Sequence, residues 1–486
     1  GRRGRHAVER MSTLDAGFYF VEHENVPMHI GTLTVFEGPA PSYDDLLALY
    51  SAKLAAVPRY RQVVRTTPGG VFRPYWADDP EFEIGYHLRH SAVPPPGGPA
   101  QLMAMAARVL AQKLDRARPL WEAWFLEGLD GGRWAIISKV HHCMVDGIGG
   151  SDLMAALFDV GPDGEPPRPV PWTPDRGPSM ATVIASGILD DVVAPVRQLV
   201  SLPGLVRRRL GSAGQALSYG AGLARAAGRL TARSARSLNG PIGPHRRWAW
   251  TTASLTEVKA IKNGLGGTVN DVVLAAITAG FRDLLAERGE LRPGLVVRSL
   301  IPVSLRGADD RELASNKLSA MLANLPVGED DPVRRLELLH DQMADLKATR
   351  QAVGPEIVTD LVGLAAAPVL ARGARAAFRL PQPLVQTITT NVPGPGFPLY
   401  LLGRKMVQAY PYVPIADRLL LGVAIFSYLD TFYFGITAEY RQISPADLRT
   451  FIDGINRGIA DLSAEVPAAA RGRPRRGGSG RGRPTG

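Results

Sequence analysis

Hydrophobic and polar positions follow more than one period in the first half of the chain, up to about residue 165. Apolar residues recur at helical spacing in 44–54 and 101–114, whereas 135–140 has the pattern of a strand. The remaining segments of this half are short, with hydrophobic and polar residues in alternation. This mixture predicts an α/β or α+β fold.

The second half of the chain shows the same mixture. The pattern predicts helices over 269–287 and 332–346 and a continuous apolar strand over 295–303. Strands then dominate, each short, rich in β-branched or aromatic residues and bounded by turn residues: 384–391, 405–410, 419–428 and 432–440. Ser444, Pro445 and Asp447 form the N-cap and acidic first turn of a last helix. No internal repeat is visible.

A Pro/Gly/Asp-rich stretch over 161–178 separates the two halves and marks a boundary or long crossover. The following region, 179–238, is rich in Ala, Leu, Gly and Val. Within it a helix would place four arginines on one face: Arg225, Arg229, Arg233 and Arg236. This face fits either a helix lying on anionic lipid or, as we favour, the solvated side of a connecting helix.

Length and composition support two folded units. A chain of 486 residues exceeds what one hydrophobic core usually supports, and 45% hydrophobic and 21% charged residues are ordinary for a globular protein. The expected organisation is a disordered basic N-terminus (1–10), a first domain (11–165), a connector with basic amphipathic helices (166–240), a second domain (241–468) and a disordered Arg/Gly/Pro tail (469–486).

The net charge of +10 resides mostly at the two ends of the chain. From Arg471 onward there are six arginines and no acid, and residues 1–10 hold four arginines against Glu9. The body is therefore nearly neutral, without the basic stripe of a folded nucleic-acid reader, and we expect no nucleic-acid partner.

The single cysteine, Cys143, precludes an intrachain disulfide and suits a reducing compartment. No apolar segment of a secretory signal follows the basic N-terminus, and the longest apolar runs, such as 419–429, fall short of the ~18 residues of a spanning helix. We expect a cytoplasmic protein, with peripheral contact to the inner membrane face or lipid droplets as an option.

Two adjacent histidines at a strand end, His141 and His142, are the most informative residues, and Asp146 and Gly147 follow closely. Because neighbouring strand residues point to opposite faces, one histidine can face a cleft while the other packs inward. Zinc sites prefer other spacings, so we expect no metal. Asp146 and Gly147 suit a tight turn.

These residues form the motif HHxxxDG, the signature of the coenzyme A-dependent acyltransferase superfamily. From about residue 12 to about 462 the chain more specifically resembles bacterial wax ester synthase/diacylglycerol acyltransferases. The segments that carry this resemblance are Leu14-Asp15-Ala16, Pro27-Met28-His29, Pro119-Leu120-Trp121, Asn270-Asp271 and Asn391-Val392-Pro393-Gly394. Thr390 stands where the family usually has Ser, and Ser315 where Gly is expected.

The resemblance implies a two-domain, chloramphenicol acetyltransferase-like sandwich with the active site in a channel between the halves. It implies transfer of a long-chain acyl group from acyl-CoA to diacylglycerol or to a long-chain alcohol, without a covalent acyl-enzyme. The thioester is a substrate, and no cofactor is expected.

The resemblance also assigns roles within the motif: His142 is the general base, whereas Asp146 is structural. A neutral imidazole can take the hydroxyl proton, since its unperturbed pKa is near ~6.5. Asn270 is our candidate donor to the oxyanion, with Asp271 beside it. His141, Asp146 and Gly147 belong with His142 to the predicted catalytic motif. The remaining motif residues are expected to be structural: Pro119, Leu120, Trp121, Asn391, Pro393 and Gly394.

Several of these residues have simpler interpretations. A histidine pair taken alone is more often packed than catalytic, Asn270-Asp271 alone equally suits a helix N-terminus, and Trp121 suits a core. Cys143 is better explained as a small packed residue than as a nucleophile. The histidines that occur singly are interpreted as structural: His29, His87, His90, His245 and His340.

Two rival functions remain open at this point. One is a condensation-type acyltransferase that takes its acyl group from a carrier protein and shares the His142 base. The other is a catalytically inactive protein that binds lipid droplets or membranes. The identity of the acceptor that receives a labelled acyl group distinguishes the condensation-type acyltransferase from the diacylglycerol or alcohol acyltransferase. Membrane binding without turnover would favour the inactive lipid-binding protein.

Overall fold

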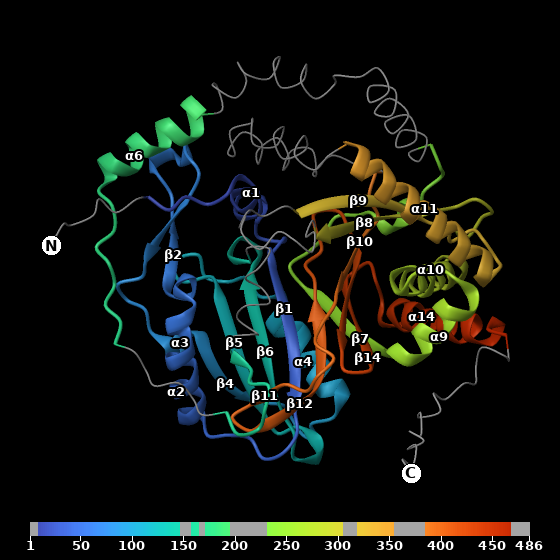
Figure 1. The fold of residues 1–486 in the computed structure, drawn as a ribbon, viewed down its shortest axis with the longest axis horizontal. Helices are drawn as coiled ribbons and strands as arrows, with labels where there is room; N and C mark the ends of the chain where they lie inside the picture. Colours follow the sequence, from blue (N-terminus) through green and yellow to red (C-terminus); the bar gives the residue numbers. More distant parts are fainter. Residues whose placement is uncertain are drawn as a thin grey trace, which may run out of the picture.

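The computed structural model describes residues 8–145, 157–164, 171–194, 231–304, 318–353 and 384–467 (Figure 1). The predicted disordered tail, Arg225 and Arg229 lie outside these ranges, as do Ser315, Asp146 and Gly147. Within them, the structure is mixed α/β with two six-stranded sheets and a short β2-β3 hairpin. The prediction of the fold class is confirmed.

The first sheet has the strand order β11-β12-β1-β6-β5-β4 and occupies the left side of Figure 1. Its strands are β1 (His29–Phe36), β4 (Leu88–Ala92), β5 (Trp121–Glu127), β6 (Trp134–His141), β11 (Tyr400–Leu401) and β12 (Arg404–Tyr412). β6 is antiparallel to both β1 and β5. The beginnings of β1 and β5 therefore lie beside the end of β6.

The second sheet has the order β7-β14-β13-β10-β8-β9. Its strands are β7 (Arg246–Ser254), β8 (Val297–Ser304), β9 (Leu318–Leu325), β10 (Thr387–Val392), β13 (Leu421–Tyr428) and β14 (Thr431–Glu439). β10 is parallel to both of its neighbours, β8 and β13, whereas the other pairs are antiparallel.

The two sheets do not divide the chain at the expected domain boundary. β11 and β12 come from the C-terminal half, yet β12 pairs with β1 along 31–36 in the first sheet. Tyrosines then join the sheets: Tyr428 and Tyr433 donate from β13 and β14 to the carbonyls of Met406 and Val407 in β12. The second half thus completes the sheet that carries the histidine motif.

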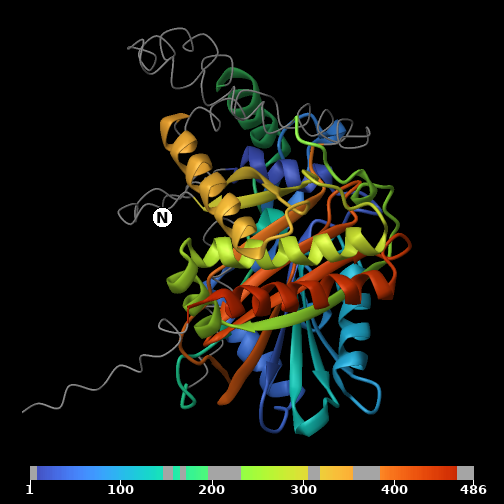
Figure 2. The same cartoon turned by 90° about the vertical axis from the view of Figure 1, so that its right-hand side faces the viewer.

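Two clusters of buried apolar side chains form the interior, one around each sheet. α10 (Val269–Glu287) and α14 (Pro445–Glu465) lie side by side over the second sheet, as Figure 2 shows, with α9 (Leu255–Leu265) and α11 (Pro332–Val353) beside them. The two helices approach closely at glycines, because a Cβ on Gly280 would lie 2.7 Å from the Phe451 carbonyl oxygen. A side chain there would push them apart.

Capping residues explain why the predicted helices begin where they do. α10 follows the capping box of Thr268 and Asp271, and α14 that of Ser444 and Asp447, so that side chains satisfy backbone N–H groups at both starts. α10 spans the predicted 269–287, and α11 runs farther than predicted.

Around the first sheet lie α1 (Thr13–Val21), α2 (Tyr43–Lys53), α3 (Ile84–His87) and α4 (Pro99–Ala111), and the hairpin consists of β2 (Gln62–Arg65) and β3 (Tyr75–Asp78). α6 (Met180–Ile188) lies at the outer edge of the molecule, at the upper left of Figure 1.

The predicted basic helix does not extend to its last two arginines. Ser234 forms a β-bridge with Val296, and Arg236–Leu238 is a single 3-10 turn. Backbone hydrogen bonds that join Ala235 and Arg233 to Val296 replace the helical ones. Pairing with the chain before β8 therefore overrides the helical spacing, and Arg233 and Arg236 do not share a helical face.

Candidate active site

Three of the sequence motifs meet at the end of β6. The His141 N–H donates to the Leu120 carbonyl at 2.9 Å, and the His142 N–H donates to the Met28 carbonyl at 2.8 Å. In the register of β1 and β6, His29 is the direct partner of His141. The antiparallel pairing thus fixes the backbone of the two histidines from both sides.

His142 is the first residue of a one-turn 3-10 helix, His142–Met144, and it is half-buried. Its ring packs against Phe18 of α1, with 4.0 Å between the ring centroids. Burial, together with the neighbouring His141, lowers the pKa of His142 to about 4, against a smaller opposing contribution from its own carbonyl. At neutral pH the imidazole is therefore uncharged and has a nitrogen lone pair that can accept a proton.

His141 occupies a different environment, since its side chain is fully buried. Its Nδ1 accepts the Cys143 N–H at 3.1 Å, and its Nε2 lies 3.4 Å from Oε2 of Glu22. Because Nδ1 is an acceptor, the proton of a neutral ring resides on Nε2 and faces the carboxylate.

Sequence reasoning missed Glu22 and its partner Arg116. Glu22 caps the C-terminus of α1, is buried, and accepts from Arg116 Nε at 2.9 Å and from the Met28 N–H at 2.9 Å. Burial alone would raise the pKa of this carboxyl, but His141, the Met28 amide and Arg116 outweigh it and lower the pKa to about 2. Nothing in a single sequence distinguishes this glutamate from the acids that surround it.

The structure also brings together the Asn270 and Asn391 motifs. Asn391, near the end of β10, donates its side-chain N–H to Oδ1 of Asn270 in the first turn of α10 at 3.2 Å. With Oδ1 occupied in this way, the amide nitrogen of Asn270 is directed elsewhere and can donate. Both side chains are half-buried.

Asp271 is fully buried and serves the helix start. Its Oδ2 accepts the Thr268 N–H at 2.8 Å and lies 2.9 Å from Nδ1 of His340. His340 was predicted to be structural, and the structure adds its contact with the motif residue Asp271. Among the motif glycines, Gly394 cannot be replaced easily, because a Cβ would lie 2.0 Å from the Ser427 carbonyl oxygen.

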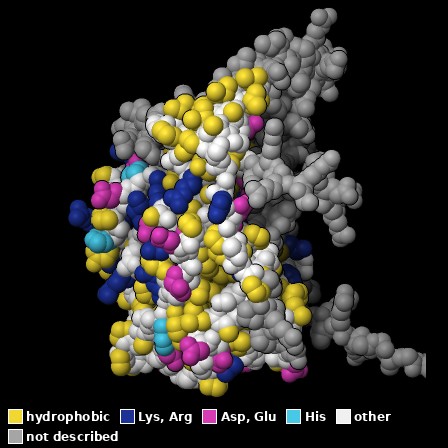
Figure 3. Space-filling view, turned by 90° about the vertical axis from the view of Figure 1, so that its left-hand side faces the viewer, with side chains coloured by type: hydrophobic (Ala, Val, Ile, Leu, Met, Phe, Trp, Pro, Cys, Tyr) yellow, Lys and Arg dark blue, Asp and Glu magenta, His cyan; other side chains and the backbone are white. Residues whose placement is uncertain are grey.

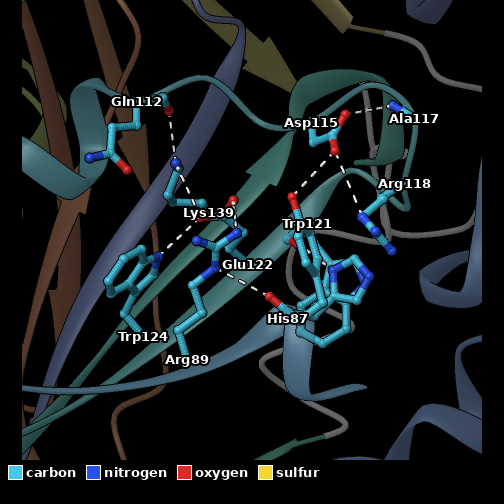
Figure 4. A network of polar contacts seen from close by, with 11 residues as sticks. His87, Arg89, Gln112, Asp115, Ala117, Arg118, Trp121, Glu122, Trp124 and Lys139 are labelled. Atoms are coloured by element: carbon cyan, nitrogen blue, oxygen red, sulfur yellow. Dashed lines mark hydrogen bonds and ion pairs between the residues drawn. The ribbon is translucent and has the colours of Figure 1, made fainter. Parts of the chain in front are cut away.

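Leu120 and Trp121 lie in the core with Pro119 just before them. The Trp121 Nε1 donates to the Tyr60 carbonyl at 2.8 Å, and its ring stacks on His87 at 4.7 Å. Figure 4 shows this pair beside a second polar group, in which Glu122 lies between Lys139, Arg89 and Trp124. Both groups connect β5 to its neighbours rather than to the His142 ring.

Cys143 is buried, and burial raises the pKa of its thiol well above the ordinary value, so it is a poor nucleophile.

Of the other single histidines, His29 bonds the Leu110 carbonyl and His87 that of Trp121, whereas His90 contacts Glu127 and His245 packs near Tyr440. Within the described ranges, no group of three or more His, Cys, Asp or Glu side chains could hold a metal ion.

Asp146 and Gly147 fall outside the described residues, which end at Val145 in this segment.

No single helix in the described part of the chain has the length and apolarity to span a membrane. Only α9 and α10 taken together are long and apolar enough, and this pair is bent by 101°. A cavity whose lining includes Trp250 and Tyr410 is lined by none of the predicted site residues.

Comparison with known proteins covers nearly the whole chain. Residues 11–273 match the model of the wax ester synthase/diacylglycerol acyltransferase catalytic domain, and residues 314–462 match that of the C-terminal domain of the same family. The probable diacylglycerol O-acyltransferase tgs1 of Mycobacterium tuberculosis is 36% identical over 469 residues, which cover 96% of this chain and 97% of that protein.

Solved structures show the same fold. The wax ester synthase/diacylglycerol acyltransferase from Marinobacter aquaeolei VT8 is 24% identical, with a TM-score of 0.67 over 94% of this chain and 99% of that one. The TRI3 trichothecene 15-O-acetyltransferase from Fusarium sporotrichioides is 16% identical, with a TM-score of 0.63 over 95% of this chain and 96% of that one.

Proposed function

The chain belongs to the wax ester synthase/diacylglycerol acyltransferase family, and from this we propose that it transfers a long-chain acyl group from acyl-CoA to the hydroxyl of diacylglycerol or of a long-chain alcohol. The observation that carries the proposal is the neutral, half-buried imidazole of His142 at the junction of three family motifs. Named diacylglycerol O-acyltransferases among the relatives favour this activity over the two rival functions.

The proposed reaction proceeds through a tetrahedral intermediate. The alcohol oxygen attacks the thioester carbonyl carbon while the His142 imidazole takes the hydroxyl proton. The negative charge that develops on the carbonyl oxygen needs a donor, for which we propose Asn270. When the intermediate collapses, the C–S bond breaks and the imidazolium returns the proton to the thiolate, which yields the ester and free coenzyme A. The passage between the two halves implied by the family would keep water from the thioester.

A competition assay tests the proposed function. Labelled palmitoyl-CoA is supplied with diacylglycerol, hexadecanol and hexadecylamine together, and the labelled products are separated. We expect triacylglycerol or wax ester as the main product. Amide as the main product would favour the condensation-type rival, and normal lipid binding without any product would favour the inactive lipid-binding protein.

The proposed role of Asn270 predicts a graded effect of two substitutions. Asn270→Ala is expected to lower kcat by about 10²- to 10³-fold, as for the loss of an oxyanion donor. Asn391→Ala should have a smaller effect, because Asn391 contacts Asn270 and acts through the orientation of its amide. Steady-state kinetics with acyl-CoA and diacylglycerol measure both. Equal losses, or a larger loss for Asn391→Ala, would contradict the assignment.

We also propose that α6 contacts a lipid surface, where both substrates would partition. One face of the helix holds it to the body, where Val183 is fully buried and Ser186 accepts from Arg10 at 3.0 Å. The other face exposes Met180, Ile184 and Ile188 by 46%, 40% and 46%. Figure 3 shows hydrophobic side chains gathered at this end of the molecule, above a group of Lys and Arg.

Replacing these three side chains with serine should release the protein from lipid. Burial of three partly exposed apolar side chains corresponds to roughly 2–4 kcal/mol, so the partition constant should fall by at least about tenfold. Flotation with phosphatidylcholine/phosphatidylglycerol vesicles that contain diacylglycerol measures this. The control, Ala181→Ser with Ala185→Ser, changes exposed positions of the same helix and should bind like wild type. Unchanged binding of the triple variant would exclude α6 as the contact.

A further inference from the structure

An ion pair between the buried Glu22 and the half-buried Arg116 lies beside His141. The two residues come from separate parts of the chain: Glu22 ends α1, and Arg116 lies in the loop between α4 and β5. Arg116 also donates to the Tyr19 carbonyl, and its guanidinium lies over the Tyr19 ring at 4.2 Å from the centroid. These contacts hold the arginine against α1, so the position of the carboxylate is fixed.

From this carboxylate, two sets of contacts lead to His142. In the first, Glu22 Oε2 faces Nε2 of His141, and Nδ1 of His141 accepts the Cys143 N–H inside the 3-10 turn that His142 begins. In the second, Oε2 accepts the Met28 N–H, and the Met28 carbonyl accepts the His142 N–H. One oxygen atom therefore supports the turn through a side chain and through the backbone.

We propose that Glu22, held in place by Arg116, is a positioning residue that fixes the tautomer and orientation of His141 and thereby the turn that presents His142. The inference rests on the proposed function of His142 as the base. A carboxylate 3.4 Å from Nε2 favours the tautomer of His141 with its proton on Nε2, and only an unprotonated Nδ1 can accept the Cys143 N–H. The carboxylate thus acts on the base without contacting the substrate.

The expected kinetic signature is a loss in kcat with little change in KM. Glu22→Gln keeps the shape of the side chain but replaces one carboxylate oxygen, an acceptor, with an NH2 group, a donor. The variant therefore cannot accept from Arg116, the Met28 amide and His141 at the same time. We expect kcat to fall by about 10- to 10²-fold and both KM values to stay within about threefold, since the groups that bind substrate are unchanged. Glu24→Gln, two residues away and exposed, is the matched control and should behave like wild type.

A double-mutant cycle with His141→Asn tests whether Glu22 acts through His141. The Asn Oδ1 can take the place of Nδ1 as acceptor for the Cys143 N–H, but the shorter side chain does not reach Glu22. If Glu22 acts through His141, adding Glu22→Gln to His141→Asn should lower kcat by less than about threefold further.

Three results would overturn the inference: unchanged kcat in Glu22→Gln, losses that multiply in the double variant, or a Glu22→Gln variant that does not fold by circular dichroism. The last would show that the carboxylate serves the fold rather than the imidazole. Wild type and His142→Ala are assayed in parallel to distinguish a failure of this inference from a failure of the proposed function. If the proposed function is wrong, the wild type itself would form no ester, or His142→Ala would form ester at the wild-type rate.

Discussion

Replacing His142 with alanine is expected to lower kcat by about 10²- to 10⁴-fold, the range that a positioned general base contributes. Without the imidazole, the acceptor hydroxyl keeps its proton while the C–O bond forms, and the intermediate is reached only with a high-energy oxonium. The side chain is half-buried and packs mainly on Phe18, so its truncation should leave the fold intact. Initial rates of labelled ester formation, with circular dichroism as a check of folding, measure the effect.

Cys143→Ser is the matched control for this variant, since Cys143 is the next residue in the same turn. Its thiol is buried and its pKa is raised well above the ordinary value, so it should not attack the thioester, and the variant should keep most of its activity. Loss of activity in Cys143→Ser together with retention in His142→Ala would require a thiol nucleophile and would overturn the mechanism.

Trp121→Ala is expected to lower the free energy of unfolding by about 3–5 kcal/mol, the cost of truncating a large aromatic residue in a core. The Trp121 side chain is 1% exposed, stacks on His87 and donates to the Tyr60 carbonyl, and this hydrogen bond would be lost. Urea unfolding followed by circular dichroism measures the change.

Trp121→Phe separates packing from hydrogen bonding at this position. It keeps most of the ring contact with His87 but removes the Nε1 donor to Tyr60, so we expect a smaller loss of about 1–3 kcal/mol. Should Trp121→Ala unfold at the wild-type urea concentration and still lose ester formation, the Pro119-Leu120-Trp121 motif would have a direct role in the reaction instead of a structural one.

The elements that the sequence predicted well are those with local signals. α10 has both the helical period and the Thr268/Asp271 capping box, and α14 has the Ser444 cap, so the chain itself specifies where these helices begin. The predicted strands of the second half, such as β13 and β14, were likewise recognisable from β-branched and aromatic residues between turns.

The placement of β12 in the first sheet was not predictable in this way. The segment 404–412 has an ordinary strand pattern, but its partner β1 lies hundreds of residues earlier, and period-2 alternation does not encode which strand pairs with which. The prediction of a helix that includes Arg233 and Arg236 was wrong for a related reason. The pairing of residues 233–235 with Val296 outweighed a weak local preference for helix.

For the candidate site, the motif identified the histidines but not what supports them. His141, His142, Asn270 and Asn391 were each singled out from sequence, and the structure adds the contact between the two asparagines. Glu22 and Arg116 had no pattern to mark them, because their significance arises only when α1 and the loop after α4 meet. A charged residue becomes informative when it is buried, and burial is a property of the fold.

The pH dependence of kcat/KM reports ionisation in the free enzyme. It therefore tests most directly the central claim that the neutral imidazole of His142 takes the hydroxyl proton. Because the pKa of His142 is lowered to about 4, the base is unprotonated and active above this value and becomes protonated as the pH falls through it. We expect kcat/KM for transfer to diacylglycerol to stay constant from neutral pH to about 5.5 and to fall about tenfold per pH unit only below about 4. A half-maximal rate near the ordinary histidine value of ~6.5, or a profile that His142→Ala leaves unchanged in height and shape, would contradict it.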